Sequence, residues 1–291
     1  MKVNELFARK TVFSFEVYPA KKTAPIQVVY DAVDALAGLG PDFISVTYGA
    51  GGGAANASAT VEIASLIENT YHLPAVAHLP GINLTREELG DLLMRLSAHR
   101  LENVLALRGD VMPGKEPTGE FAHASEVAEF IGQHVPNYFN IIGACYPEVH
   151  PEAVSPEEDL RWLRHKVDAG VDQLATQLFF DNQHFYDFLE RVREAGITAP
   201  LSAGIMPVVN ARQAARMADL CGANMPPAFT VLVERYGNDD AEMRRAGVDY
   251  AITQILDLIE HGVDGVHLYT MNDPKTAAAI SEVVKPLTDQ N

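Results

Sequence analysis

Residues 11–22 read TVFSFEVYPAKK, a run of strand-forming apolar residues that contains one carboxylate, Glu16. Side chains alternate between the two faces of a strand, so Phe13 and Phe15 share one face, while Glu16 lies on the other with Ser14. Glutamate is usually exposed, and the run alone therefore fits a strand with one solvated face as well as a carboxylate that points into the protein. The order of the remaining elements favours the second interpretation.

Apolar, β-rich runs recur along the chain, and each is followed by a longer stretch with helical spacing. The eight predicted strands are VFSFEVY (12–18), DFISVTY (42–48), PAVAHL (74–79), NVLALRG (103–109), YFNIIGACY (138–146), DQLATQLFF (172–180), PLSAGIMP (200–207) and GVHLYTM (265–271). Strict alternation of strand and helix predicts a parallel sheet with right-handed crossovers. Eight such units in 291 residues predict an α/β fold of the (β/α)8 TIM barrel class. A doubly wound open sheet is the alternative.

Four stretches carry the clearest helix signals, with Ser, Thr or Asn at several starts and Gly at the ends. They are APIQVVYDAVDALAGLG (24–40), TREELGDLLMRLSAHR (85–100), SPEEDLRWLRHKVDAG (155–170) and NQHFYDFLERVREAG (182–196). Residues 223–262 are long enough for extra helices before the last strand. We find no low-complexity linker and no shift in composition, so we expect residues 1–291 to form a single barrel domain.

The overall charge limits the classes of partner. A net charge of −17 makes nucleic acid and anionic membranes poor partners, because both need a basic surface. A local cationic pocket for a phosphorylated cofactor is compatible with this charge. Cys145 and Cys221 are too few for a disulfide framework. Without a signal-like apolar core or a long apolar segment, the sequence predicts a cytoplasmic protein.

Polar residues collect at the carboxyl ends of the predicted strands, where the loops of a (β/α)8 barrel build its active site. These residues are Glu16, Thr47, His78, Arg108, Asp110, Tyr146, His150, Gln177 and Asn272. A barrel has no structural need for a polar ring at this position. The pattern therefore predicts a functional site at the mouth of the barrel.

Other motifs predict no further chemistry. GAGGGA (49–54) has the spacing of a dinucleotide-binding turn, but the next strand ends in His78 instead of an acidic residue. GDVMPGKE (109–116) has the spacing of a phosphate-binding loop, yet Glu116 replaces the Ser or Thr that binds magnesium. EVHPE (148–152) is the only weak metal candidate, and we expect no metal.

Taken together, the strand ends resemble the methylenetetrahydrofolate reductases, flavoproteins of one-carbon metabolism and methionine biosynthesis. The motifs that carry the resemblance, over nearly the whole chain, are SFEVYP, SVTYGAGG, AHL, ALRGD, YPEVHPEA, KVDAG, TQLFFD, GIMPV and LYTMN. The resemblance implies a barrel that binds FAD at its mouth. It also implies a ping-pong cycle in which a reduced nicotinamide and then the folate, 5,10-methylenetetrahydrofolate, use the same flavin face.

The resemblance also assigns site residues. The implied cofactor-binding set is Thr47, His78, Arg108, Asp110, Tyr146, His150, Asp159 and Lys166. Glu16 matches the family's proton donor, and Asp110 would tune the flavin and act as a second catalytic residue. The implied substrate-binding residues are Gln177, Gln213 and Tyr269.

Elementary chemistry supports the role of Glu16. Opening the five-membered ring of the folate requires a proton on the departing nitrogen. A carboxyl group donates at neutral pH only if its pKa is raised, and an inward position among aromatic rings favours the neutral form.

Substrate-side departures leave the electron donor open. Asp273 stands where relatives carry Arg, and Met217 replaces a family aromatic. An alternative is therefore a flavin-binding barrel that takes electrons from a partner protein. A non-flavin aldolase using Lys21 or Lys22 as a Schiff base is a third hypothesis, although neither lysine lies within a predicted strand. A homo-oligomer is compatible with the sequence.

Overall fold

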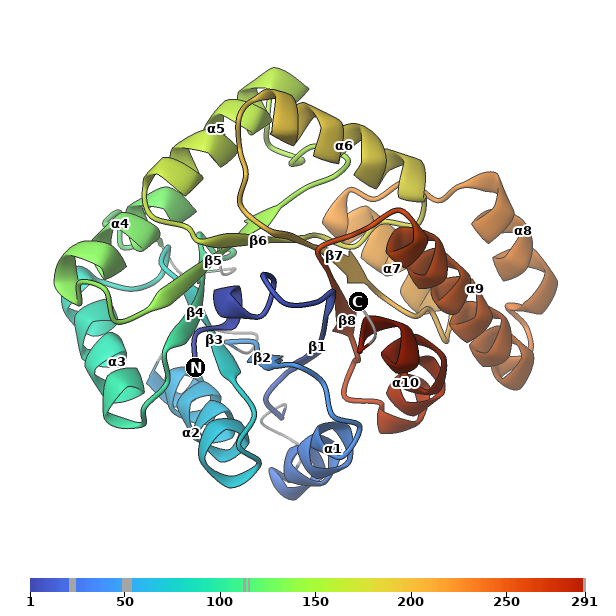
Figure 1. The fold of residues 1–291 in the computed structure, drawn as a ribbon, viewed down its shortest axis with the longest axis horizontal. Helices are drawn as coiled ribbons and strands as arrows, with labels where there is room; N and C mark the ends of the chain where they lie inside the picture. Colours follow the sequence, from blue (N-terminus) through green and yellow to red (C-terminus); the bar gives the residue numbers. More distant parts are fainter. Residues whose placement is uncertain (21–24, 49–53, 112–113, 115, 290–291) are drawn as a thin grey trace.

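The strands of the chain form a closed barrel. The computed structural model describes residues 1–20, 25–48, 54–111, 114 and 116–289. In these residues the strands pair in parallel and in chain order, and β8 pairs with β1 (Figure 1). They are β1 (Val12–Val17), β2 (Ile44–Val46), β3 (Ala75–Pro80), β4 (Asn103–Leu107), β5 (Asn140–Cys145), β6 (Gln173–Thr176), β7 (Leu201–Ile205) and β8 (Gly265–Tyr269). The predicted (β/α)8 barrel is confirmed. The alternative of an open sheet is wrong, because an open sheet has two unpaired edge strands, whereas β1 and β8 pair with each other here.

Helices surround the barrel and follow its strands. They are the 3-10 helix η1 (Val3–Glu5) and the α-helices α1 (Gln27–Ala37), α2 (Ala54–Thr70), α3 (Arg86–Ala98), α4 (Ala124–His134), α5 (Pro156–Asp168), α6 (Asn182–Glu194), α7 (Ala211–Cys221), α8 (Pro227–Tyr236), α9 (Asp240–Glu260) and α10 (Pro274–Thr288). Thr85 and Ser155 cap α3 and α5 as predicted. Helix α6 begins at Asn182 as predicted, but its cap is Asp181, which accepts a hydrogen bond from the Gln183 backbone N–H.

The extra helices before the last strand are confirmed. Helices α7, α8 and α9 lie between β7 and β8 and form a separate bulge beside the barrel (Figure 1). Their packing centres on Phe229, whose ring stacks on Phe180 at 4.5 Å and meets Tyr250 edge-on at 5.1 Å. Burying a large aromatic side chain stabilises a fold by about 1.5–3 kcal/mol. These contacts therefore hold the three extra helices against the loop that follows β6.

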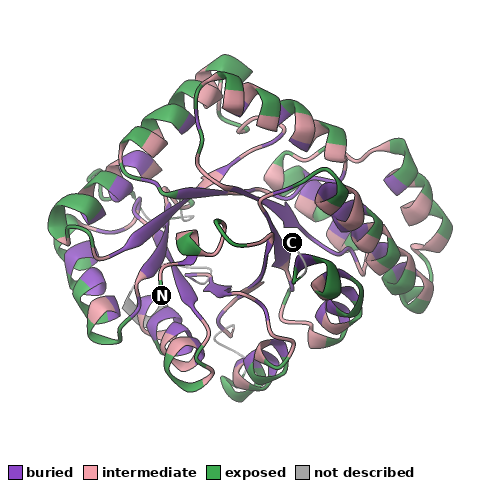
Figure 2. Cartoon of the chain, in the orientation of Figure 1, coloured by how far each residue is buried: buried purple, intermediate pink, exposed green. Residues whose placement is uncertain are grey.

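The barrel interior is filled at one end and open at the other. Val12, Phe43 and Val76 pack with Val3 of the N-terminal segment, which lies across the amino ends of the strands (Figure 1). The strands are buried along most of their length (Figure 2). Because this end is closed by apolar side chains, ligands must enter from the carboxyl ends of the strands.

Some residues singled out in the sequence fall outside the described part of the chain. They are Lys21, Lys22, residues 49–53 of GAGGGA, and residues 112, 113 and 115 of GDVMPGKE.

Candidate active site at the barrel mouth

A cavity of about 490 Å³ occupies the mouth of the barrel. Ten of the twelve predicted site residues line it, namely Glu16, Thr47, His78, Arg108, Asp110, Tyr146, His150, Lys166, Gln177 and Tyr269. They come from β1 to β6 and β8, the loops that follow these strands, and helix α5. The strand-end pattern therefore brings together side chains that are up to 253 residues apart in the chain, as Glu16 and Tyr269 are.

Glu16 lies at the floor of this cavity and points inward. In the sheet it pairs with Ser45 of β2 and Tyr269 of β8, while the neighbouring Phe15 is fully buried on the outer face. Only 22% of the Glu16 side chain is exposed, and that part faces the cavity. Burial raises the pKa of Glu16 from 4.5 to about 8. The alternation of the strand thus places a neutral carboxylic acid beneath the cavity.

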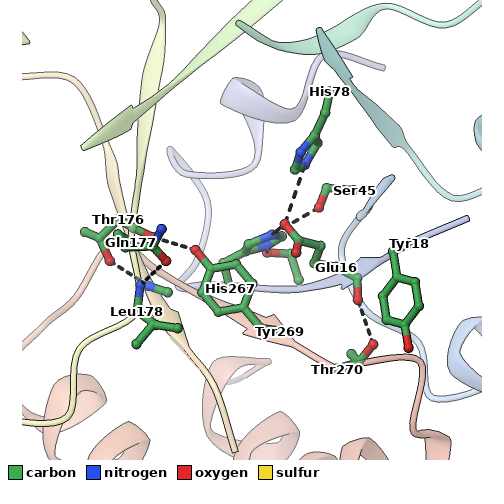
Figure 3. A network of polar contacts seen from close by, with 12 residues as sticks. Glu16, Tyr18, Ser45, His78, Thr176, Gln177, Leu178, His267, Tyr269 and Thr270 are labelled. Atoms are coloured by element: carbon green, nitrogen blue, oxygen red, sulfur yellow. Dashed lines mark hydrogen bonds and ion pairs between the residues drawn. The ribbon is translucent and has the colours of Figure 1, made fainter. Parts of the chain in front are cut away.

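Two histidines flank this carboxyl group (Figure 3). His78 Nε2 lies 3.6 Å and His267 Nε2 lies 3.9 Å from Glu16 Oε2. Burial lowers the pKa of His78 to about 3, with a further contribution from His267, and burial lowers the pKa of His267 to about 4. At neutral pH both rings and the carboxyl group are therefore uncharged, and neither contact is an ion pair.

Hydrogen bonds fix the orientation of His267 but not that of His78. His267 Nδ1 lies 2.7 Å from Ser14 Oγ, and its Nε2 lies 3.1 Å from Ser45 Oγ. By contrast, His78 Nε2 is buried and has no hydrogen-bond partner among the described residues. A buried nitrogen without a hydrogen-bond partner costs free energy. His78 Nε2 can therefore form a hydrogen bond with a ligand in the cavity.

Tyr269 and Gln177 line the same cavity. The Tyr269 hydroxyl donates a 2.6 Å hydrogen bond to the Thr176 carbonyl, and the Leu178 N–H donates to Gln177 Oε1 at 2.8 Å (Figure 3). A Cβ atom at Gly204 would lie only 2.6 Å from the Tyr269 hydroxyl and 2.3 Å from the Thr176 carbonyl. Glycine at this position therefore permits the close approach that holds this part of the cavity wall in place.

Arg108 and Asp110 follow β4 at the rim. Gly109 between them has a positive φ of 83° and packs against Pro80, where an added Cβ would come within 2.6 Å. The Arg108 guanidinium forms a two-pronged ion pair with Glu152, and the contact from its Nη2 to Oε1 measures 2.9 Å. Sequence reasoning missed Glu152 because its partner is 44 residues away.

Lys166 and Asp159 project from α5 toward the same rim. The Lys166 ammonium donates a 2.5 Å hydrogen bond to the Ala144 carbonyl, and burial lowers its pKa. Asp159 accepts a 3.0 Å hydrogen bond from the His150 backbone N–H and thereby shapes the loop after β5. Asp159 lines a second cavity of about 240 Å³, which shares Arg108, His150 and Lys166 with the mouth. The two cavities are therefore adjacent, and Ala124 also lines both.

Two predicted positions have other surroundings. Gln213 on α7 lines a third cavity of about 240 Å³, which shares Met271 with the mouth. Asp273 caps α10 by accepting hydrogen bonds from the Lys275 and Thr276 backbone N–H groups, and it also pairs with Arg244. Asp273 also lines the third cavity, so an effect of its charge on ligands stays a prediction.

Asn272 is likewise structural. Its side-chain oxygen accepts from the Tyr18 N–H at 3.0 Å, and its nitrogen donates to the Tyr18 carbonyl at 2.8 Å. These contacts join the ends of β1 and β8. Sequence reasoning also missed His267, although it lies two residues before Tyr269 on the same face of β8.

The described residues contain no cluster of three or more His, Cys, Asp or Glu side chains arranged to hold a metal ion. No helix in the described ranges is both long and apolar enough to cross a membrane.

Comparison with known proteins identifies similar chains. A family model described as methylenetetrahydrofolate reductase matches residues 2–285. The 5,10-methylenetetrahydrofolate reductase of Escherichia coli (strain K12) is 35% identical over 273 residues, which cover 92% of this chain and 88% of that protein. Methylenetetrahydrofolate reductase (NADH) 1 of Arabidopsis thaliana is 34% identical over 284 residues, covering 93% of this chain and 48% of the plant protein. The chain thus spans about half the length of this plant relative.

A solved structure shares the fold. It is described as an uncharacterized protein from Clostridium thermocellum that binds two copies of 5-methyl-5,6,7,8-tetrahydrofolic acid. The TM-score is 0.69 at 12% sequence identity, and the match covers 99% of both chains.

Proposed function

The chain belongs to the methylenetetrahydrofolate reductase family, and we propose that it binds FAD at the barrel mouth and reduces 5,10-methylenetetrahydrofolate to 5-methyltetrahydrofolate. The observation that carries the proposal is the inward carboxylic acid of Glu16, which burial keeps protonated at neutral pH. The reaction needs an acid of this kind, because the folate ring opens only when its departing nitrogen is protonated.

The residues at the mouth fit FAD. The two adjacent cavities, of about 490 and 240 Å³, offer space for a flat ring system and an extended chain. Arg108 and Lys166 line both cavities and carry side chains that suit a pyrophosphate, which would compete with Glu152 for the Arg108 guanidinium. The buried and unpartnered Nε2 of His78 meets the inner cavity, as a flavin-facing group would.

Bound FAD would supply the chemistry of hydride transfer from a reduced nicotinamide to the folate. Glu16 supplies the proton: its O–H bond breaks as the folate nitrogen gains an N–H bond, and the C–N bond of the five-membered ring opens. This leaves an iminium carbon that accepts two electrons as hydride, and Glu16 becomes a carboxylate. General acid catalysis of this kind is typically worth ~10² to 10⁴ in rate.

The surroundings of Glu16 support this role. A cationic neighbour would lower its pKa and hold it as a carboxylate, but His78 and His267 are both neutral at pH 7. The hydroxyls of Ser14 and Ser45 hold His267 in place, which keeps the carboxyl group confined between the two rings. Asp110 and Gln177 face the same cavity as candidate ligands for the pterin and flavin edges.

We assign NADH as the donor on the basis of the plant relatives, whose names specify it. A protein electron donor is the alternative, because Met217, one of the substrate-side departures, lines the mouth.

Purification and anaerobic titration test the proposal. The protein should be yellow, release FAD on heating, and bleach when NADH is added without a partner protein. A protein that retains flavin but bleaches only with a partner would support the electron-transfer subunit. A colourless protein that takes up no added FAD would refute the proposed function.

A further inference from the structure

A buried carboxylate that the proposed reaction does not use joins the loop after β5 to the end of α7. Only 7% of the Glu148 side chain is exposed. Its Oε2 accepts hydrogen bonds from the Asn224 backbone N–H at 2.9 Å and from the Asn224 side-chain Nδ2 at 2.5 Å. His184 Nε2 of α6 lies 3.6 Å from the same oxygen. Glu148 Oε1 is buried and has no hydrogen-bond partner among the described residues, a cost that stability alone does not explain.

The backbone next to Glu148 is strained. Val149 has a φ of 75°, in the left-handed region that a β-branched residue rarely adopts. Such strain persists where the surrounding contacts require one particular geometry. Here the loop turns so that Glu148 contacts Asn224 while His150, two residues later, lines the mouth of the barrel.

A second contact joins the same two segments. Gly222, which follows α7, has a φ of 67°, and a Cβ atom added to it would lie 2.9 Å from Pro151 Cγ. Pro151 belongs to the loop after β5, and Asn224 lies two residues beyond Gly222. The loop that carries Tyr146 and His150 therefore holds the end of α7 at two points.

Helix α7 carries residues of the substrate side. Met217 and Cys221 line the mouth, and Gln213 lines the third cavity. Only two residues of this helix, Ala214 and Ala218, are buried, so it gains little from burying apolar side chains. The polar contacts at its end therefore contribute a large share to its position.

We propose that Glu148 is a positioning residue that holds α7 against the loop after β5 and thereby sets the Michaelis constant for the folate. The inference rests on the proposed function. The flavin-binding part of the loop has a support of its own, because Asp159 accepts a 3.0 Å hydrogen bond from the His150 backbone N–H. Loss of the Glu148 contacts should therefore release α7 and leave His150 in place.

Kinetics of the flavin-loaded protein test the inference. Glu148→Ala should raise the Michaelis constant for 5,10-methylenetetrahydrofolate about 10-fold, the size expected for lost charge-assisted hydrogen bonds. The dissociation constant of FAD and the limiting rates of both half-reactions should stay within about 2-fold of the parent, since those sites keep their contacts. Glu148→Gln retains an acceptor for Asn224 and should restore most of the parent behaviour. Asn224→Asp, at an exposed position, places two carboxylates together and should raise the same Michaelis constant without leaving a cavity.

Asp257→Ala is the matched control. Asp257 of α9 also joins two elements, because its Oδ2 accepts 2.6 Å hydrogen bonds from Asn182 and Tyr186 of α6, but it does not line the mouth. This variant should have a lower melting temperature and an unchanged Michaelis constant for the folate.

The outcomes separate this inference from the proposed function. An unchanged folate Michaelis constant in Glu148→Ala and Asn224→Asp, or an equal loss of FAD affinity, would overturn the role of Glu148. If Glu148→Ala does not fold, Asn224→Asp decides the question alone. A parent protein that binds no FAD, or whose reduced flavin the folate does not reoxidise, would instead overturn the proposed function.

Discussion

Replacing Glu16 with glutamine is the perturbation that bears most directly on the proposed acid. Glutamine keeps the shape of the side chain and some of its hydrogen bonding, but it carries no proton that can be transferred to the folate. We expect Glu16→Gln to fold, retain its yellow colour and be reduced by NADH at the parent rate, because that half-reaction needs no proton from this group. The reoxidation of the reduced protein by 5,10-methylenetetrahydrofolate should fall by at least ~10².

The pKa of Glu16 sets the size and the pH dependence of this effect. With a pKa of about 8, roughly 90% of the carboxyl groups are protonated at pH 7. At the ordinary value of 4.5 only about 0.3% would be protonated, so burial enlarges the acid population roughly 300-fold. The folate half-reaction of the parent should therefore be fast below pH 7 and slow as the pH rises through about 8. Glu16→Gln should lack this dependence.

Rapid mixing under anaerobic conditions measures both half-reactions separately. Absorbance of the flavin follows reduction by NADH and reoxidation by the folate between pH 6 and 9. Equal slowing of both half-reactions in Glu16→Gln would make Glu16 a structural or flavin-tuning group. A folate half-reaction that is unaffected by the substitution would refute its role as the acid.

Three further predictions concern stability and cofactor retention. Lys166→Met should weaken FAD binding about 10-fold or more in equilibrium dialysis without lowering the melting temperature, because the ammonium is costly to bury and is kept for a ligand; unchanged affinity would contradict its assignment. Burial lowers the pKa of His78 to about 3 and that of His267 to about 4, below the ordinary 6.5, so the free energy of unfolding is highest above pH 6.5 and decreases as the pH falls toward these values. The melting temperature of the parent should thus fall more steeply below pH 6.5 than that of His267→Gln, and parallel curves would refute this. Asp273→Ala should lower the free energy of unfolding by about 1 kcal/mol through loss of the α10 cap, while Asp273→Asn retains most of it; a change in folate Michaelis constant with unchanged stability would restore a ligand-facing role.

The sequence was sufficient to predict the barrel and most of its mouth. Strands alternate with a period of two, which places Glu16 on the face opposite Phe13 and Phe15, and the alternating order of strands and helices made that face the inner one. The carboxyl ends of parallel strands lie at one edge of the sheet. This rule alone predicted that His78, Tyr146 and Gln177 lie around one cavity.

The remaining features depend on contacts that no local pattern contains. A polar residue after a strand serves equally well as a ligand, a cap or a bridge between strands, and Asp273 and Asn272 proved to be the latter two. The position of Gln213 depends on how the extra helices pack, which its own sequence does not specify. The pairing of His123 with Trp162 joins two helices 39 residues apart, and only the folded chain brings the rings together.

In the proposed reaction, this barrel transfers reducing equivalents from a bound flavin to a methylene-folate. The most direct measurement mixes the anaerobically reduced protein with 5,10-methylenetetrahydrofolate and follows both the flavin colour and the folate product in one turnover. We expect the yellow colour to return with formation of one 5-methyltetrahydrofolate per FAD. A flavin that stays reduced, or that regains its colour without formation of the methyl product, would contradict the claim.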